Sequence, residues 1–368
     1  MKIVTTADWH LRNDDPYGSK DENHVNEFLQ HRYKVCQDII KLSQKLDAHL
    51  LVAGDVFDSR LVDGITLSYG ASVGKSLEQL KAAIVIEGNH GFESVTGNTG
   101  TISHWKYVLP DNVHIVTYPK VVAIDDVEYH CIPGTANVER NFVPIVKELL
   151  KQTAGCKTKI LALHGIVVGA QYDSGSKASS GILLSKLQKL VAKRYDYIVC
   201  GDLHKHQFLD DRIWYTGSPI QASLKDLDIE KGVQIIDTDK KAVQFKKIPG
   251  PVFRRYDWTM GEKIAKQLKN PVEYKDELKN AYVVLNIDGK AENIDSGKID
   301  RVVDNLKKAG AHKTFVQKRA TATESDRKFV EKGISLQEMV EAWVEHRLED
   351  LPSEKQEVVS TGVQYLES

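Results

Sequence analysis

Residues 2–10 read KIVTTADWH, an apolar run that stops in an aspartate and a histidine. Its Ile, Val and Thr residues are typical of a buried strand. Four later runs end in the same way, in a short polar cluster: HLLVAG (49–54), AIVIEG (83–88), KILALH (159–164) and YIVCG (197–201). Polar side chains at the ends of parallel strands gather at one edge of a sheet, where open α/β folds bind ligands. The five runs therefore predict an α/β fold with a binding site at that edge.

The five clusters hold carboxylate, amide and imidazole groups but no thiolate. They are Asp8-x-His10, Gly54-Asp55-x-x-Asp58, Gly88-Asn89-His90, His164-Gly165 and Gly201-Asp202-x-His204. Such a set of oxygen and nitrogen donors suits manganese or iron, is compatible with zinc, and favours magnesium less because of its imidazoles. Together the clusters predict a site for two divalent cations.

Each cluster has an ordinary alternative when it is considered alone. Asp55 or Asp58 could be the N-cap of a helix, and Gly-Asn pairs are common in turns. His164 could be a buried histidine with a backbone partner, and Asp202 could be a loop acid. The prediction of a metal site depends on all five clusters occurring in order, each at the end of an apolar run.

Composition limits the class of protein. A length of 368 residues exceeds one ordinary domain, so we expect a core with one or two accessory units. A hydrophobic content of 41% with 27% charged residues is typical of a globular protein, and the net charge of −1 gives no overall nucleic-acid signature. Four cysteines without a C-x-x-C pair predict reduced thiols. No leader-like start or membrane-length apolar run is seen, so we expect a cytoplasmic protein without membrane contact.

Up to residue 250, apolar runs alternate with helical patterns, which predicts βαβ units and a parallel or mixed sheet. Helices are expected at 23–46, 67–80, 138–150 and 182–192. After Asp202, short apolar runs joined by polar turns predict a closing section of antiparallel strands.

Pro249-Gly250-Pro251 marks the end of this core (1–250), because two prolines around a glycine interrupt any regular element. Residues 251–320 are expected to form a small α+β domain. Its expected elements are a strand at 282–287, a helix at 299–309 and a strand at 314–318. Polar residues 321–333 read as a linker. Residues 334–368 resume an amphipathic helical pattern whose apolar face includes Trp343.

The order of the clusters, D-x-H, GD-x-x-D, GNH, HG and GD-x-H, resembles that of the calcineurin-like metallophosphoesterase family. Within this family, GDVFDSR (54–60), YIVCGDLHKHQ (197–207) and YTGSPIQAS (215–223) are similar to the SbcD-type nucleases, the nuclease subunits of SbcC–SbcD complexes, including phage-encoded ones. The resemblance covers the whole chain. It implies a two-sheet sandwich flanked by helices, a small capping domain that contacts DNA, and C-terminal helices.

The resemblance also implies the roles of the site residues. The first metal would be held by Asp8, His10, Asp55 and His204, and the second by Asp55, Asn89, His164 and Asp202. His90 would contact the scissile phosphate and protonate the leaving oxygen, and Asp58 would orient it. Two residues depart from the family pattern. Asp202 stands where the last motif usually has a histidine, with His206 as an alternative imidazole, and Gly91 stands where an aspartate usually follows GNH.

The function implied by the resemblance is hydrolysis of DNA phosphodiesters with two divalent metals, most simply Mn²⁺, with Mg²⁺ as the alternative. The activities would be 3′-to-5′ exonuclease and endonuclease on DNA ends, hairpins or single strands, in DNA repair, recombination or replication. An SbcC-like coiled-coil ATPase would bind the C-terminal helices, and a homodimer would form through 66–80 and 101–108.

Basic residues near the clusters are candidate DNA contacts: Arg12, Lys20, Arg60 and Lys177. Lys177 lies in YDSGSKASSG (172–181), which reads as a mobile segment. Two other functions stay open. The chain could hydrolyse a small phosphodiester or nucleotide, or it could be a non-catalytic scaffold that binds DNA ends.

Overall fold

The computed structural model describes residues 1–92, 99–135, 138–227, 229–260, 266–289 and 295–320. The chain forms two compact units. The first contains Met1–Arg254 and Asn280–Tyr282, and the second contains Arg255–Lys279 and the residues from Val283 onward. The predicted linker at 321–333 and the predicted helices at 334–368 lie outside the described residues.

The first unit is built on two six-stranded sheets. In spatial order, the first sheet contains β12 (Ala242–Lys247), β11 (Gly232–Asp237), β1 (Lys2–Thr6), β2 (His49–Val52), β3 (Ala83–Ile86) and β4 (Val113–Val116). The second contains β5 (Lys120–Ile124), β6 (Val127–Ile132), β7 (Thr158–His164), β8 (Tyr197–Gly201), β10 (Ile213–Tyr215) and β9 (Gln207–Asp210). Strands β1 to β4 are parallel, as are β6, β7, β8 and β10.

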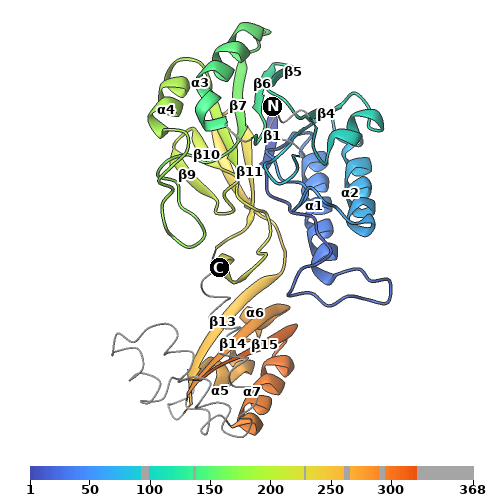
Figure 1. Ribbon diagram of the computed structural model, residues 1–368, viewed down its shortest axis with the longest axis vertical. Coiled ribbons are helices and arrows are strands. Elements are labelled where there is room, and N and C mark those ends of the chain that lie inside the picture. Colours follow the sequence, from blue (N-terminus) through green and yellow to red (C-terminus); the bar gives the residue numbers. More distant parts are fainter. Residues whose placement is uncertain (93–98, 136–137, 228, 261–265, 290–294, 321–368) are drawn as a thin grey trace, which may run out of the picture. The chain divides into compact units, whose positions relative to one another are not determined.

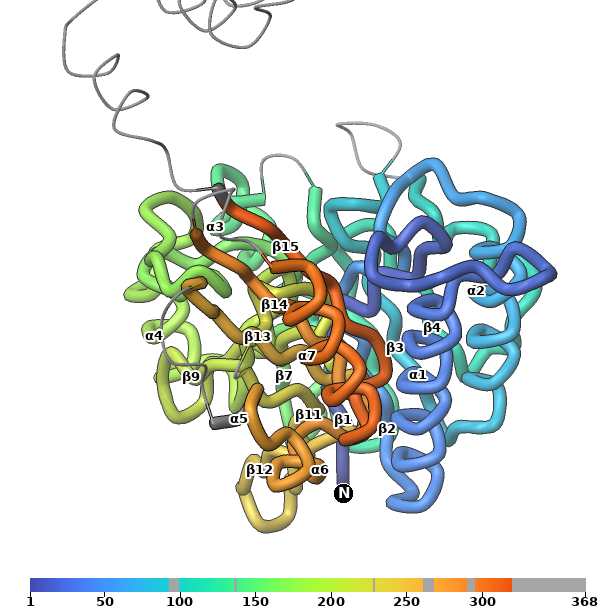
Figure 2. The backbone as a smooth tube through the Cα atoms, turned by 90° about the horizontal axis from the view of Figure 1, so that it is seen from below, coloured from blue at the N-terminus to red at the C-terminus, as the bar shows by residue number. Residues whose placement is uncertain are grey.

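Helices cover the outer face of each sheet. The first sheet packs on α1 (Glu27–Lys45) and α2 (Gly64–Leu77), and the second on α3 (Val138–Leu149) and α4 (Leu184–Lys193). Figures 1 and 2 show the two helix pairs on opposite flanks of the sheets. A third apolar cluster fills the space between the sheets, where Ile3 and Leu51 meet residues of β6 to β8. The predicted α/β sandwich of two sheets flanked by helices is confirmed.

The prediction of an antiparallel closing section is only partly correct. Strand β11 runs antiparallel to β1, and β12 antiparallel to β11. Strand β10, in contrast, pairs in parallel with β8, because β9 takes the outer position and pairs antiparallel with β10. Short strands β4, β5 and β6 and the single-turn helices η1 (Ser103–Tyr107), η2 (Leu150–Gln152) and η3 (Leu224–Asp226) were not predicted.

The second unit has a three-stranded sheet in the order β13 (Val252–Thr259), β14 (Ala281–Gly289) and β15 (Lys313–Ala320). Helix α7 (Ser296–Lys308) precedes β15 and begins at the N-cap Asp295. Short helical turns precede β14: α5 (Lys266–Lys269), η4 (Pro271–Tyr274) and α6 (Lys275–Leu278). The expected strand, helix and strand of this region correspond to β14, α7 and β15, whereas β13 was not predicted.

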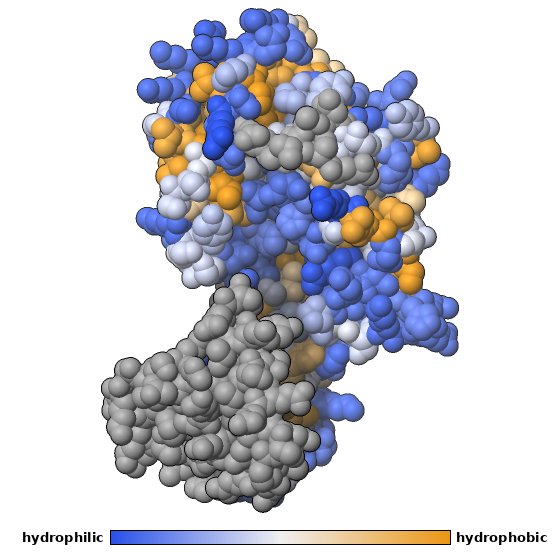
Figure 3. All heavy atoms as spheres, in the orientation of Figure 1, coloured by the Kyte–Doolittle hydropathy of each residue, from blue (hydrophilic) through white to orange (hydrophobic). Residues whose placement is uncertain are grey.

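Two further observations bear on the sequence-based expectations. No helix among the described residues is both long and apolar enough to cross a bilayer. All four cysteines are free, and three of them are buried. Figure 3 shows mainly hydrophilic side chains on one face of the first unit, with smaller apolar patches.

Candidate metal centre

Five parallel strands bring the polar clusters to one edge of the two sheets. Asp8 and His10 follow β1, Asp55 follows β2, Asn89 follows β3, His164 ends β7, and Asp202 and His204 follow β8. Because β1, β2 and β3 run parallel in the first sheet, and β7 and β8 run parallel in the second, their carboxyl ends lie together. All seven predicted ligands therefore belong to one cluster of side chains in the first unit.

Backbone hydrogen bonds hold the first two clusters in register. The amides of Asp8 and His10 donate to the carbonyls of Gly54 and Asp55, each at 3.0 Å. The pairing of β1 with β2 thus continues past the ends of the strands. The amide of Asp202 donates to Asp8 Oδ1 at 3.1 Å, which connects the second sheet to the first.

Several candidate ligands have strained backbones. The φ angles of Asp8, His10, Asp55 and Asp202 are 56°, 45°, 50° and 101°, in the left-handed region that disfavours side chains. Each such residue costs about 1–3 kcal/mol, and strain of this kind is concentrated at functional sites. The tight bends aim the side chains of these residues into the cluster.

Glycines leave space for His164. A Cβ atom at Gly54, whose φ is +107°, would lie 1.9 Å from Nδ1 of His164, and one at Gly201 would lie 2.0 Å from the carbonyl oxygen of Ala53. The ring therefore fits between the two sheets. Its Nδ1 donates to the Ala53 carbonyl at 2.8 Å, so its Nε2 faces the cluster.

Asp55 lies at the centre of the cluster. Its Oδ2 is 3.3 Å from Nε2 of His164, 3.8 Å from Nε2 of His10 and 3.9 Å from Nε2 of His90. Two compact groups of ligand atoms share it: one with His10 and His90, the other with Asp8 and His164. A carboxylate common to both groups is suited to bridging two cations. These two groups differ from the two ligand sets that the family resemblance implies. His90 belongs to the group with His10, and Asp8 belongs to the group with His164.

The remaining predicted ligands complete the cluster. Nε2 of His204 lies 2.9 Å from Nε2 of His10, so the two rings aim their nitrogens at one point. The side-chain nitrogen of Asn89 donates to Asp202 Oδ1 at 3.1 Å. This contact turns the side-chain oxygen of Asn89 toward Nε2 of His164, at 3.4 Å. Asn89 therefore presents an oxygen, the atom that a cation would require.

His206 does not reach the cluster. Its Nδ1 lies 2.6 Å from the side-chain nitrogen of Gln234, and its ring stacks on Phe245 at 4.6 Å between centroids. Asp202 instead lies 3.8 Å from Nε2 of His164. Of the two residues considered at this position, the structure brings only Asp202 to the other donors.

The charges of the cluster fit divalent cations. Burial raises the pKa of Asp8, and the charge on Asp55 adds to that shift. Burial likewise raises the pKa of Asp202. Burial opposes a charge on His164, but Asp55 and the other two carboxylates raise its pKa to about 10. Three buried carboxylates that repel one another in this way are stabilised by bound cations, so the residues present fit two divalent metals.

Asp58 contacts two histidines with different atoms. Its backbone carbonyl accepts a hydrogen bond from Nδ1 of His90 at 2.7 Å. Its carboxylate lies 3.0 Å from Nδ1 of His10 and accepts from Arg12 at 2.9 Å. Burial opposes a charge on Asp58, yet His10 and Arg12 hold its pKa well below the usual range. The carbonyl of Asp58 thus orients His90, whereas the carboxylate orients His10, a contact that the sequence did not predict.

Arg12 is part of this network. It also lies 3.5 Å from Asp15, and its side chain is only partly exposed. Arg12 therefore holds Asp58 in place and is less suited to DNA contact than predicted, whereas Lys20 and Arg60 are exposed.

Glu87 occupies the space that the unusual Gly91 leaves. The Glu87 side chain is buried and accepts from the Ile102 amide at 3.0 Å and from the Thr101 hydroxyl at 3.2 Å. A Cβ atom at Gly91 would lie 2.0 Å from Glu87 Oε1. A buried glutamate thus fills the space beside Gly91, behind the loop that carries His90.

Gly91→Ala is expected to lower the free energy of unfolding by about 1–3 kcal/mol, because the new methyl group overlaps a carboxylate that cannot move freely. Chemical denaturation of the full chain measures this change. Gly64→Ala is the matched control, since a Cβ atom at Gly64 meets nothing within 4 Å. The cost of Gly91→Ala should shrink in a Glu87→Ala background. Equal stability of the Gly91 and Gly64 variants would contradict the overlap.

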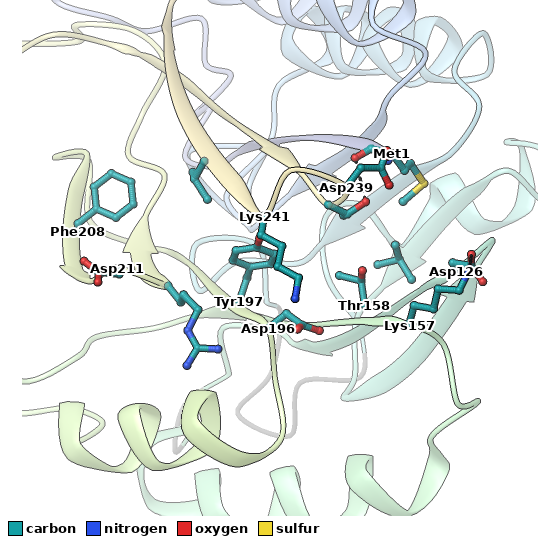
Figure 4. Close-up of a pocket in the computed structure, with 14 residues that line it drawn as sticks. Met1, Asp126, Lys157, Thr158, Asp196, Tyr197, Phe208, Asp211, Asp239 and Lys241 are labelled. Atoms are coloured by element: carbon teal, nitrogen blue, oxygen red, sulfur yellow. Dashed lines mark hydrogen bonds and ion pairs between the residues drawn. The ribbon is translucent and has the colours of Figure 1, made fainter.

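A separate pocket of about 670 Å³ lies at the opposite end of the strands, where β7 and β8 begin. Figure 4 shows Lys241, Tyr197 and Asp196 among the side chains that line it. Four aspartates, three basic side chains and the N-terminal residue line this pocket, so it has no net preference for an anion. It is distinct from the cluster around Asp55.

A two-sheet sandwich with Asp, Asn and His side chains gathered at its strand ends is typical of metal-dependent hydrolases, among them those that act on phosphoesters. The sequence profile of the family described as calcineurin-like phosphoesterases matches residues 1–206, which include all seven candidate ligands together with Asp58 and His90. The chain belongs to the calcineurin-like phosphoesterase family. Members of this family hydrolyse phosphoesters with two divalent metals.

Proposed function

We propose that this protein is a manganese-dependent DNA nuclease of the SbcD type. It would act as exonuclease and endonuclease on DNA ends, hairpins or single strands, as the nuclease subunit of an SbcC–SbcD-like complex in DNA repair, recombination or replication. The observation that carries the proposal is His90, a half-exposed imidazole 3.9 Å from the shared carboxylate Asp55. This position suits an acid that protonates the leaving oxygen of a phosphodiester.

The charge distribution supports a polyanionic substrate. Residues 251–320 contain 15 Lys and Arg against 10 Asp and Glu, a formal charge of +5 in a chain whose total is −1. Positive charge concentrated in one region favours contact with phosphates. A small phosphodiester would not require this second region.

The proposed reaction assigns a task to each group. Asp8, His10, Asp55 and His204 would hold one metal, and Asp55, Asn89, His164 and Asp202 the other. When bound, the metals supply a nucleophilic water and neutralise charge on the phosphoryl oxygens. The carbonyl of Asp58 accepts the Nδ1 proton of His90, so the Nε2 of the protonated ring can donate to the leaving sugar oxygen.

Two partners belong to the proposal. An SbcC-like coiled-coil ATPase would bind the helices predicted at 334–368. A second copy of the chain would pack on α2 and η1, where Leu67, Tyr107 and Val108 expose apolar surface.

The test is cleavage of an end-labelled DNA duplex by the purified full chain in Mn²⁺, compared with hydrolysis of bis(p-nitrophenyl) phosphate. We expect cleavage of both, and loss of both in a chelator. Hydrolysis of the small diester alone would favour a small-molecule phosphodiesterase. Binding of DNA ends without any hydrolysis would favour a scaffold.

A further inference from the structure

The segment between β7 and α4 brings an acid to His204. Asp173 Oδ2 lies 3.7 Å from Nδ1 of His204, and the Asp173 side chain is only 16% exposed. Its other oxygen, Oδ1, is buried and has no hydrogen-bond partner in the described part of the chain. A buried acceptor without a donor is costly, so its position beside an imidazole requires an explanation.

The segment around Asp173 is a hydrogen-bonded turn, closed by a bridge between Gln171 and Lys177. The amide of Tyr172 donates to the Ser176 carbonyl at 2.9 Å, and the amide of Gly175 donates to the Tyr172 carbonyl at 2.9 Å. Asp173 therefore occupies a defined turn of the backbone.

The turn is anchored to the residues that follow His204. The amide of Gln171 donates to the side-chain oxygen of Gln207 at 2.8 Å, and the Gln207 side-chain nitrogen donates back to the Gln171 carbonyl at 2.8 Å. Lys205 donates to the Gln171 side chain at 2.7 Å. Asp173 lies two residues after Gln171, and His204 lies one residue before Lys205. These contacts therefore fix Asp173 relative to His204.

The backbone of His204 is held from another side. Lys231 is buried, donates to the His204 carbonyl at 2.9 Å and pairs with Asp226 at 2.5 Å. The ring of His204 thus depends on Asp173 alone for a polar contact at Nδ1 among the described residues.

The tautomer of each ring decides whether its Nε2 can bind a cation, because that nitrogen must carry a lone pair and Nδ1 must carry the proton. Nδ1 of His164 donates to the Ala53 carbonyl at 2.8 Å. Nδ1 of His10 lies 3.0 Å from the Asp58 carboxylate. The third ring, His204, needs an acceptor in the same position.

We propose that Asp173 is a positioning residue that accepts the Nδ1 proton of His204 and so directs its Nε2 at the metal facing His10. The separation of 3.7 Å in the structure is longer than a hydrogen bond, and the proposal requires it to shorten in the metal-loaded protein. The inference rests on the metal centre of the proposed function and is independent of whether the substrate is DNA.

Mn²⁺ binding to the full chain tests the inference without any measurement of activity. In Asp173→Asn, one of the two binding steps is expected to weaken about tenfold, because partners of this kind typically contribute 10–100-fold to metal affinity. Asp211→Asn is the matched control, since Asp211 is an exposed acid at the opposite end of the strands. Calorimetric titration gives both affinities, and failure to cleave DNA would leave this result unaffected.

A second comparison separates positioning from a structural role. In a His204→Ala background, Asp173→Asn should have no further effect on Mn²⁺ affinity. Wild-type affinity in Asp173→Asn would overturn the proposal, as would an equal tenfold loss in the His204→Ala background. If Asp173→Asn fails to fold, Asp173→Glu and Asp173→Ala are compared instead. The Mn²⁺ affinity of Asp173→Glu is then expected to be closer to that of the wild type than the affinity of Asp173→Ala. Equal affinities of the Glu and Ala variants would also overturn it.

Discussion

Asp55→Asn is expected to abolish phosphodiester hydrolysis and to remove both metals from the protein. The Asp55 carboxylate belongs to both compact groups of donor atoms, with three imidazole nitrogens between 3.3 and 3.9 Å from its Oδ2. Asparagine has one neutral oxygen and cannot bridge two cations. Because partners outside the coordination shell already contribute 10–100-fold to affinity, loss of the shared ligand should cost at least about 100-fold.

Metal content after equilibration with Mn²⁺ and gel filtration measures this effect. The wild-type chain should retain two ions and Asp55→Asn none. Asp14→Asn is the matched control, since Asp14 is 85% exposed and lies near Arg12, outside the cluster. Two tightly bound ions in Asp55→Asn would show that another group bridges the metals.

The same variant should change stability in a pH-dependent way when no metal is present. The carboxylates raise the pKa of His164 to about 10, above the ordinary value of 6.5. A raised histidine pKa contributes stability that is fully present below pH 6.5 and is lost as the pH rises through 10. Asp55→Asn removes the nearest carboxylate, so its melting temperature should fall below that of the wild type at pH 6, with a smaller difference near pH 10. A difference that grows with pH would contradict the assignment.

His90→Asn is expected to slow DNA cleavage by about 10²–10⁴-fold while two metals stay bound. Nδ1 of His90 is held by the Asp58 carbonyl at 2.7 Å, and its ring is half exposed, as a proton donor to a leaving group requires. Its proximity to His10 and Asp55 also allows a role as a ligand. The metal content of His90→Asn separates the two roles. The variant would lose an ion if His90 were a metal ligand, and would keep both ions if His90 acts only as the proton donor.

A comparison of two leaving groups makes this test sharper. Nitrophenolate leaves readily without a proton, whereas a sugar alkoxide does not, so His90→Asn should impair DNA cleavage far more than hydrolysis of bis(p-nitrophenyl) phosphate. His104→Asn is the matched control, since His104 is also exposed and bonds a backbone carbonyl through Nδ1. An equal loss with both substrates would contradict acid catalysis by His90.

Much of the fold could be predicted because the strands that carry the site have a local signal. Strands β1, β2, β3, β7 and β8 are apolar runs that stop at Gly, Asp or His, and βαβ connection makes their ends converge. Strand β10 was misjudged because its parallel pairing with β8 depends on the position of β9 and not on its own residues. Pairing partners are a tertiary property that single-strand patterns do not contain.

The identity of the candidate ligands could be predicted, but the contacts that orient them could not. The Asp58 carboxylate turns to His10 and its carbonyl to His90, a division that the spacing of the residues in the sequence does not reveal. Asp173 lies about 30 residues from His204 in a segment whose Gly and Ser residues resemble any surface loop. The contact of Glu87 with Gly91 could not be predicted for another reason. Glycine has no side chain, so the sequence gives no sign of the residue that fills the space beside it.

Electron paramagnetic resonance of the full chain, titrated with Mn²⁺, tests the central claim most directly. Two ions that share Asp55 should lie about 3.5–4 Å apart, so the spectrum should change from that of free Mn²⁺ to that of a spin-coupled pair at two ions per chain. Asp55→Asn should show no coupled signal. A single bound ion, or two ions without coupling, would contradict a dinuclear centre bridged by Asp55.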